Sequence, residues 1–518
     1  YSSYGYNLLG AVIEGASKQA YGDYMREHVW TPLGMNDTHM DDPNEIIPNR
    51  VQGYRLIDGK LKNSEFIDIS SRFAAGGTIS TVVDLLKYTR GLSTEKVLSQ
   101  RSIELMFTSM ATKDGHFTDY GMGWRLEPVN GRYIVYHTGS QAETRTLLVR
   151  FPKEHFYMAL AYNFEGADRH AYAQRLAQLI LEEPWNMHVY TGDKVDDVFY
   201  RGLWDVFNYG LSYFDRYQKP LTRDEKQVAE AFAYFNKYVN RAQIKSDFNK
   251  TFRKIRDGRH PVANEAFVKI GSYMAAQLQE KFGTPRRETY HKMGAITFFK
   301  DYLELCQQNP DYPVALRFTE QFEKTVTEWN LDWQKTCTDY TRRLAITPSS
   351  NIEKIGNELK KTFSNARVYP DFSQDFADVI RYFYIKGDQK QTFTAANLAL
   401  ELYPQSTLPE VLMANAYVCF GEKEKARKLY KKTLASHQGD WNISAFSLNR
   451  YAKELANFGK LDEAAELLQV AIELFPRAAR LYDSLAEIHL KRGKNYYQKA
   501  LQLDATFEPA RQSLKKLP

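Results

Sequence analysis

The sequence of 518 residues predicts a multidomain protein. An α+β sandwich with an antiparallel sheet comes first, and an all-α region that ends in a helical solenoid follows it. Three observations support this fold class. Runs of β-branched and aromatic residues near 133–162 are typical of strands. Apolar residues at three- and four-residue spacing begin near residue 195, and glycines recur at regular intervals close to the C-terminal end.

Within residues 1–185 we expect strands at 133–136, 145–151 and 156–162, with a closing helix near 171–182. The strand segments are rich in Val, Ile, Tyr and Phe, which fit a pleated and half-buried surface. A helix after them can cover one face of the sheet they form. This part of the chain is therefore predicted to be the larger part of an α/β sandwich.

Two short motifs in this part carry chemistry. Tyr1-Ser2-Ser3 opens the chain, and His137-Thr138-Gly139 follows Ser3 after 134 positions, with Ser140 next. The surrounding segments are YSSYGYNLLGAVIE at 1–14, TPLGMNDT at 31–38 and AAGGTISTVVDLL at 74–86. Their wording and order resemble the serine β-lactamase, penicillin-binding-protein and esterase family of class C type. The His in the third motif is similar to the branch of the mitochondrial β-lactamase-like protein.

The resemblance implies a role for each motif residue. Tyr1 would be the phenol that moves a proton between nucleophile and leaving group. Ser3 replaces the usual Asn and keeps a donor and an acceptor on a shorter arm. The Ser140 N–H would be an oxyanion donor, so the implied catalytic residues are Tyr1, Ser3, His137 and Ser140. Thr138 and Gly139 would contact substrate, and His137 would add charge there if it is protonated.

One motif of the family is absent. Ser-x-x-Lys supplies the nucleophile and its lysine, and in the family it precedes the tyrosine motif. Ser93-Thr94-Glu95-Lys96 has the pattern, but it follows the tyrosine motif and is interpreted as a chance match. The chain is therefore expected to be a truncated hydrolase that is inactive alone. Glu143, where relatives usually have Gly, would disfavour tight binding of penicillin carboxylates.

Composition narrows the class of protein. The net charge is +6, from 69 basic and 63 acidic residues that are spread along the chain, so no nucleic-acid partner is expected. Apolar runs are short, and no transmembrane segment is expected. Cys306, Cys337 and Cys419 lack metal-ligand spacing, and free thiols are favoured over a Cys306–Cys337 disulfide. We expect no cofactor and no metal, since His260 has no His-Glu-x-x-His pattern.

The C-terminal part carries a repeat. Gly387, Gly421, Gly459 and Gly493 recur at intervals of 34, 38 and 34 residues. This period resembles tetratricopeptide repeats, which are helix–turn–helix units that stack into a solenoid. The fourth unit is five residues short, so its second helix should be short or distorted. The domains are predicted at 1–185 (hydrolase), 195–369 (helical linker) and 373–518 (repeats).

Two functions are open. The first is a serine hydrolase that acts through an acyl-enzyme on a small peptide ending in D-Ala-D-Ala, a β-lactam or an ester, with a protein partner on the groove of the repeats. The second is a non-catalytic interaction scaffold that retains a degenerate hydrolase domain, and the repeats could instead be a structural extension. The compartment is unknown, and a periplasmic or exported location is only what the family resemblance implies.

Overall fold

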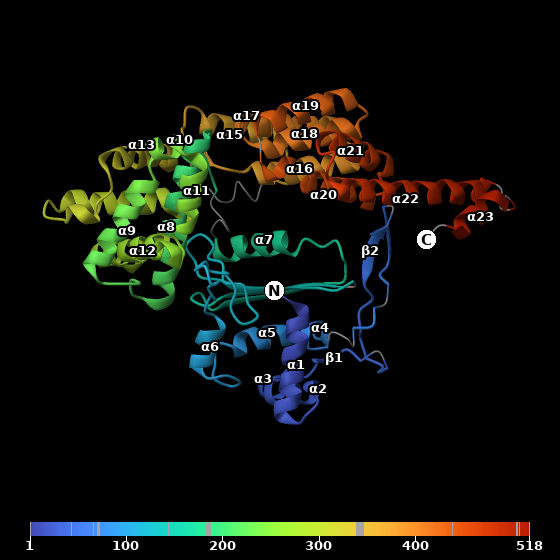
Figure 1. Ribbon diagram of the computed structural model, residues 1–518, viewed down its shortest axis with the longest axis horizontal. Helices are drawn as coiled ribbons and strands as arrows, with labels where there is room; N and C mark the ends of the chain where they lie inside the picture. The colour runs from blue at the N-terminus through green and yellow to red at the C-terminus, as the bar shows by residue number, and fades with distance from the viewer. Residues whose placement is uncertain are drawn as a thin grey trace. The chain divides into compact units, whose positions relative to one another are not determined.

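The computed structural model describes residues 2–42, 44–57, 59–65, 67–69, 73–142, 144–182, 188–337, 346–437, 439–503, 506 and 508–516. The chain, which Figure 1 colours by residue number from the N-terminus to the C-terminus, divides into two compact units. The first unit holds Tyr1–Arg55 and Asn63–Thr338, and the second holds Leu56–Lys62 and Asp339–Pro518. Each unit is described by itself.

The first unit contains a three-stranded antiparallel sheet in the order β5-β6-β7. Its strands are β5 (Val135–Ser140), β6 (Arg145–Phe151) and β7 (Phe156–Tyr162). The predicted ranges of β6 and β7 are confirmed. The first strand begins at residue 135 instead of 133, because Gly131 adopts φ +77 in a turn that pairs Arg132 with Val129.

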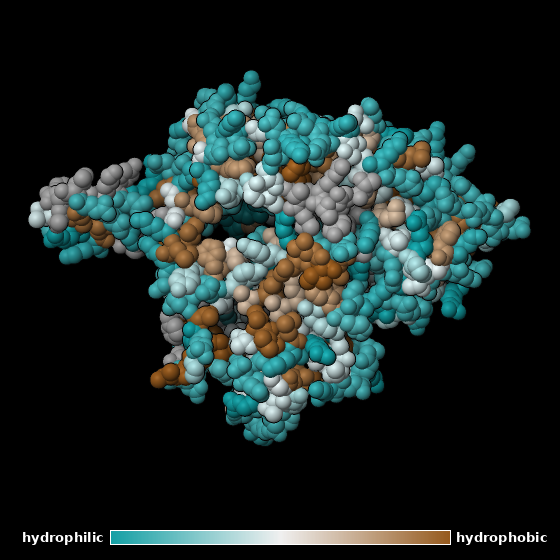
Figure 2. Space-filling model, turned by 180° about the vertical axis from the view of Figure 1, so that it is seen from behind, coloured by the Kyte–Doolittle hydropathy of each residue, from teal (hydrophilic) through white to brown (hydrophobic). Residues whose placement is uncertain are grey.

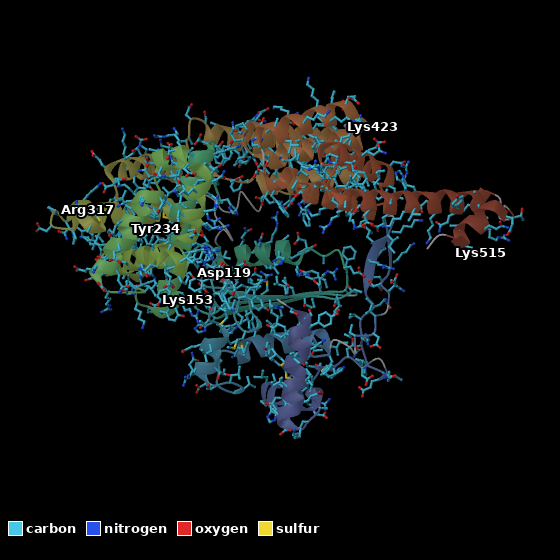
Figure 3. All side chains as sticks on the ribbon, in the orientation of Figure 1. Asp119, Lys153, Tyr234, Arg317, Lys423 and Lys515 are labelled. Carbon is cyan, nitrogen blue, oxygen red and sulfur yellow. The ribbon has the colours of Figure 1, made fainter. Side chains whose placement is uncertain are left out.

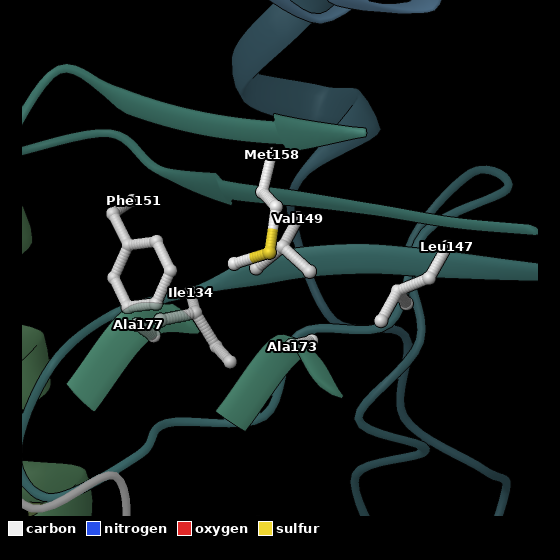
Figure 4. Packing of buried hydrophobic residues seen from close by; sticks show 7 residues of the cluster. All are labelled: Ile134, Leu147, Val149, Phe151, Met158, Ala173 and Ala177. Atoms are coloured by element: carbon white, nitrogen blue, oxygen red, sulfur yellow. The ribbon is translucent and has the colours of Figure 1, made fainter. Parts of the chain in front are cut away.

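Helices cover both faces of this sheet. On one face α7 (Arg169–Leu181) buries two alanines against aliphatic and aromatic strand residues, as Figure 4 shows. On the other face lie α5 (Val82–Gly91) and α6 (Gln100–Met106), and a second cluster of buried hydrophobic residues forms there. Alternate strand residues enter the two clusters because successive Cβ atoms point to opposite faces. The first cluster consists of Ile134, Leu147, Val149, Phe151, Met158, Ala173 and Ala177.

Short elements precede α5. They are α1 (Ser3–Ser17), α2 (Tyr21–Met25), a π-helix (Arg26–Trp30), α3 (Thr31–Leu33), β1 (His39–Met40), β2 (Tyr54–Ile57), β3 (Lys60–Asn63), α4 (Phe73–Gly76) and β4 (Thr78–Ile79). Ser2 caps α1 by accepting a hydrogen bond from the Gly5 N–H at 3.3 Å. Asn7 of α1 holds α4 by accepting from the Ala75 N–H at 3.1 Å. The opening segment is thereby tied to the residues that lead into α5.

Part of the surface is apolar, and Figure 2 shows hydrophobic patches on one face of the molecule. Two helices of the first unit contribute exposed apolar residues: Leu8, Leu9 and Val12 on α1, and Leu176, Leu179 and Ile180 on α7. Contiguous exposed apolar surface is a common mark of contact with another segment or molecule.

The rest of the first unit is helical. Its helices are α8 (Lys194–Tyr217), α9 (Glu225–Tyr238), α10 (Arg241–Ser246), α11 (Phe248–Asp257), α12 (Ala266–Gln308) and α13 (Glu320–Thr336), with 3₁₀ turns at Pro261–Ala263 and Val314–Leu316. Inside α12 the backbone is non-helical at Gly283 and again at Gly294, so the helix has two breaks. A Cβ on Gly271 would lie 2.1 Å from the Val206 carbonyl oxygen, so α8 and α12 cross backbone to backbone.

Helix α12 begins at Ala266, because the backbone at Asn264 and Glu265, just before it, is left-handed. Upstream of this start, His260 Nδ1 accepts a hydrogen bond from the Phe117 N–H of the sheet-bearing part at 2.9 Å. The His260 side chain is also packed against the ring of His116, with ring centroids 5.0 Å apart. His260 is 4% exposed, and burial together with Arg259 lowers its pKa to about 4. The contact therefore requires the neutral imidazole.

Acidification is expected to weaken this contact. An unfolded His takes up a proton below about pH 6.5, whereas folded His260 does so only near pH 4, so stability is full above 6.5 and falls between these values. Between pH 7.5 and pH 5 the loss from this residue should be about 2 kcal/mol. Urea unfolding of the unaltered chain at pH 7.5 and at pH 5 measures this loss of free energy. His260→Asn, which keeps a hydrogen-bond acceptor but does not titrate, is compared at the same pH values. Parallel pH profiles of the two proteins would contradict the assignment.

The second unit is almost entirely helical. The strand β8 (Val189–Tyr190) precedes α8 and belongs to the first unit. The described elements after residue 346 are α15 (Ile352–Phe363), β9 (Tyr369–Pro370), α16 (Ser373–Lys386), α17 (Gln389–Leu402), α18 (Thr407–Cys419), α19 (Lys423–Ser436), a 3₁₀ turn (Trp441–Ile443), α20 (Ala445–Asn457), α21 (Leu461–Leu474), α22 (Ala479–Leu503) and α23 (Glu508–Lys516). Gly387, Gly421 and Gly459 separate successive helices with φ near +80. Gly493 differs, because α22 continues through it.

Two further expectations concern the whole chain. Cys306, Cys337 and Cys419 are free thiols, as favoured, and no disulfide joins them. In the part of the chain that the structure describes, no helix combines the length and the hydrophobicity that crossing a membrane requires.

Candidate functional site

The predicted motif His137-Thr138-Gly139-Ser140 lies at the end of the edge strand β5. On the inner side β5 pairs with β6, and on the outer side Tyr136 exchanges backbone hydrogen bonds of 2.8 and 3.1 Å with Arg125. In an antiparallel ladder, alternate residues direct their N–H and C=O groups to opposite edges. Thr138 and Ser140 therefore present their backbone donors and acceptors to the outer edge, beyond the Arg125 bridge.

The side chains of the motif are divided between the two faces of the sheet. His137 and Gly139 share the face of Val135, toward α5 and α6, whereas Thr138 and Ser140 share the face toward α7. Gly139 also meets a packing requirement, because a Cβ there would lie 2.2 Å from Thr146 Oγ1 on β6. The four motif residues, although adjacent in sequence, thus place their side chains on opposite faces of the sheet, two on each face.

His137 has a partner that the sequence did not reveal. Its Nε2 lies 2.9 Å from the hydroxyl oxygen of Tyr120, and the two rings meet edge to face. Burial, followed by the nearby charge of Arg125, lowers the pKa of His137 below its ordinary value. The lowered pKa favours the neutral imidazole, so the condition under which His137 would add charge is disfavoured. The neutral form can exchange a hydrogen bond with a phenol but adds no charge.

Positive charge comes instead from Arg169, which was not predicted. This residue begins α7, and its Nη1 donates to Ser140 Oγ at 3.0 Å and to the Gly139 carbonyl at 3.3 Å. Burial and the neighbouring Arg145 lower the pKa of the Arg169 guanidinium from its very high ordinary value. A guanidinium is a suitable partner for a carboxylate. The C-terminal end of β5 is therefore cationic on the α7 face.

The tyrosine motif is described only in part. Tyr1 and Glu143 lie outside the described residues. Ser3 is exposed in the first turn of α1, on an element separate from β5. The structure thus brings His137, Thr138, Gly139 and Ser140 together on one strand, while Ser3 belongs to a different element.

A cavity of about 660 Å³ lies near the end of β5. Thr146, which pairs with Gly139, lines it on the sheet side, and Gly76 of α4 lines it on the other side. Gln141 bridges these walls, since its Nε2 donates to the Gly76 carbonyl at 3.1 Å. This volume is within the range of small-molecule sites. The AAGG segment and Thr146, the β6 partner of Gly139, thus border one cavity, whereas His137, Thr138, Gly139 and Ser140 themselves do not line it.

The alternative Ser-x-x-Lys pattern at residue 93 has a different environment. The Ser93 hydroxyl accepts a hydrogen bond from Arg150 Nη2 at 2.7 Å and shares another with the Tyr157 hydroxyl. These partners are a cation and a phenol on β6 and β7, at the opposite end of the sheet from Ser140. Ser93 is therefore remote from the motif strand's end.

Comparison with known proteins relates the N-terminal part to one family. Residues 1–182 match the family model described as Beta-lactamase. Penicillin-binding protein 4* of Bacillus subtilis is 28% identical over 166 residues, or 29% of this chain and 36% of that protein. The mitochondrial serine beta-lactamase-like protein of Mus musculus is 29% identical over 181 residues, or 30% of this chain and 33% of that protein. The chain thus spans about a third of the length of these relatives.

Solved structures give weaker overlaps. The octameric penicillin-binding protein homologue from Pyrococcus abyssi is 29% identical, with 36% of this chain and 43% of that chain covered and a TM-score of 0.32. The D-amino acid amidase from Ochrobactrum anthropi SV3, complexed with L-phenylalanine amide, is 23% identical, with 32% and 50% covered and a TM-score of 0.28.

Proposed function

From the relationship of residues 1–182 to the β-lactamase and penicillin-binding-protein family, we propose that the intact protein is a serine hydrolase working through an acyl-enzyme. Its substrate would be a peptide ending in D-Ala-D-Ala, a β-lactam or an ester. The open outer edge of β5 is the observation that carries the proposal. A substrate lying along this edge would meet the Ser140 N–H, a donor suited to an oxyanion.

The side chains then take separate roles. Tyr1 would carry the proton, and Ser3 would contact the substrate's amide from α1. Neutral His137, held by Tyr120, would keep its face of the edge polar without attracting anions. A substrate carboxylate would find its charge partner in Arg169, with the Thr138 hydroxyl on the same face.

The nucleophile in this proposal belongs to a Ser-x-x-Lys segment outside the sequence. Activation of a serine hydroxyl needs a base close to it, and in this proposal the lysine of that segment and Tyr1 provide it. The exposed apolar residues Leu8, Leu9 and Val12 of α1 offer a surface on which such a segment could bury apolar side chains. The free energy of that burial would hold the nucleophile beside Tyr1.

Extension of the reading frame upstream tests the proposal. About a hundred preceding codons should encode Ser-x-x-Lys, and the extended protein should release p-nitrophenol from p-nitrophenyl acetate, whereas residues 1–518 alone should not. Replacing the motif serine with alanine in the extended protein should abolish the turnover and the initial burst. An upstream sequence without the motif, or turnover that survives the serine replacement, would contradict the hydrolase.

The competing proposal is a scaffold without catalysis. It is favoured by Ser3, which shortens the arm of the usual Asn, and by the helices α16 to α22, which we propose form a tetratricopeptide-type array that binds a protein partner. The two proposals separate in the same assay, because a scaffold has no ester turnover with or without the upstream segment. An exported or periplasmic location is proposed only from the family resemblance.

A further inference from the structure

A second cavity, of about 410 Å³, lies at the opposite end of β6 from Ser140. Its walls come from α6, from the end of β6 and from the last turn of α8. Three basic residues line it, Arg150, Lys153 and Arg216, and Lys153 is labelled in Figure 3. None of these three residues has a role in the proposed hydrolase, so this cavity is distinct from the proposed active site.

Arg150 is a buried cation without an anionic partner among the residues that the structure describes. The residue is 2% exposed, and its Nη2 donates a hydrogen bond to Ser93 Oγ at 2.7 Å. Among the described residues, Nε and Nη1 of Arg150 are buried and have no partner. The guanidinium lies over the Phe107 ring, 4.7 Å from its centre, and burial lowers its pKa. A buried charge with unused donors is costly unless a ligand supplies acceptors.

Arg216 is a second guanidinium at the same cavity. Its Nη1 donates to the Phe107 carbonyl at 2.9 Å, and its plane covers the Tyr133 ring at 4.5 Å. In the described part of the chain, no carboxylate lies within ion-pair distance of Arg216 or Arg150. Phe107 thus contacts both cations, one through its ring and one through its carbonyl oxygen.

The carboxylates at this cavity have other partners. Glu154 pairs with Arg132, and Asp215 pairs with Lys153, Arg287 and His291. Glu104 is exposed and accepts from Gln100 Nε2 at 3.2 Å. Two positive charges at the cavity are therefore left for a ligand to neutralise.

We propose that this cavity binds a small molecule bearing a phosphate group. Two guanidiniums provide two positive charges, which match a phosphate dianion better than a carboxylate, and their planar forks suit its oxygens. The volume is enough for a phosphorylated small molecule. The site joins the sheet-bearing part to α8, so an occupied cavity would stabilise the junction between them.

Inorganic phosphate is the first probe. Isothermal titration calorimetry of the full chain at pH 8 should show saturable phosphate binding, with acetate binding much more weakly. Arg216→Gln and Arg150→Gln should each weaken phosphate binding by about tenfold or more, because each loses a charged donor. Arg223→Gln, an exposed arginine with the same change of charge, should bind as the unaltered chain does.

Three results would overturn the proposal: no saturable phosphate binding by the unaltered chain, equal affinity in Arg216→Gln, or acetate bound as tightly as phosphate. Arg150 is buried, so circular dichroism must show that Arg150→Gln is folded. Should that variant fail to fold, Arg216→Gln decides the outcome alone, because Arg216 is only partly buried.

Discussion

Replacing Tyr1 with phenylalanine is expected to lower the kcat of the extended, active protein by about 10²- to 10⁴-fold, the range of a lost general acid–base group. The substitution removes only the hydroxyl that would carry the proton and keeps the aromatic ring. KM should change little, because the lost interaction acts in the transition state. Steady-state hydrolysis of p-nitrophenyl acetate measures both constants.

Tyr4→Phe is the matched control. Tyr4 lies three residues further along the chain, in α1, and its side chain is almost fully exposed, so loss of its hydroxyl should leave kcat unchanged. If Tyr1→Phe and Tyr4→Phe hydrolyse the ester at the same rate, the proton-transfer role of Tyr1 is wrong.

Replacing Asp215 with alanine is expected to lower the free energy of unfolding by about 3–5 kcal/mol, the range for one partner lost from a buried ion pair. Burial opposes the charge of Asp215, but the hydrogen bond from His291 and the charges of Lys153 and Arg287 outweigh it and keep its pKa below the usual value. Asp215→Ala removes the carboxylate that faces buried Arg287 and His291, and leaves Arg287 only the more distant Glu288, at 3.7 Å. Urea unfolding at neutral pH gives the difference.

The network around Asp215 explains why the loss should be large. His291 Nε2 lies 3.1 Å from Asp215 Oδ2, and its Nδ1 lies 2.9 Å from the Asn130 carbonyl oxygen, so both ring nitrogens face acceptors. Lys153 of the turn after β6 reaches the same carboxylate at 3.2 Å. Asp311→Ala, at an exposed acid, should change stability by less than about 0.5 kcal/mol. Equal losses in the two variants would refute the structural role of Asp215.

The local sequence pattern was sufficient to predict secondary structure where a segment's conformation depends mainly on its own residues. The strands β6 and β7 begin and end as predicted, since β-branched and aromatic runs suit a buried sheet. The strand predicted at 133–136 is confirmed in its second half, and β5 continues through the motif to Ser140. The fourth repeat unit was expected to have a short or distorted second helix, but α22 runs continuously through Gly493, because one glycine does not by itself end a helix.

Long-range contacts account for what the sequence could not predict. Tyr120 and Arg169 approach His137 and Ser140 from a loop and from α7, and no periodicity marks either residue. The hydrogen bond between the Phe117 N–H and His260 joins residues 143 positions apart, and no local pattern marks it. The unusual state of Arg150 could not be predicted either, because it depends on the burial of the guanidinium and on which side chains pack around it.

The crossing of α8 and α12 at Gly210 and Gly271 has a practical consequence for anyone who shortens this protein. The same helix α8 carries Asn208, which accepts from the Gly131 N–H at 2.7 Å in the turn that leads into β5. Removing everything after residue 182 would strip that turn of its acceptor and leave Lys153 without its carboxylate. A minimal soluble fragment is therefore better ended after residue 337 than at the limit of the family match.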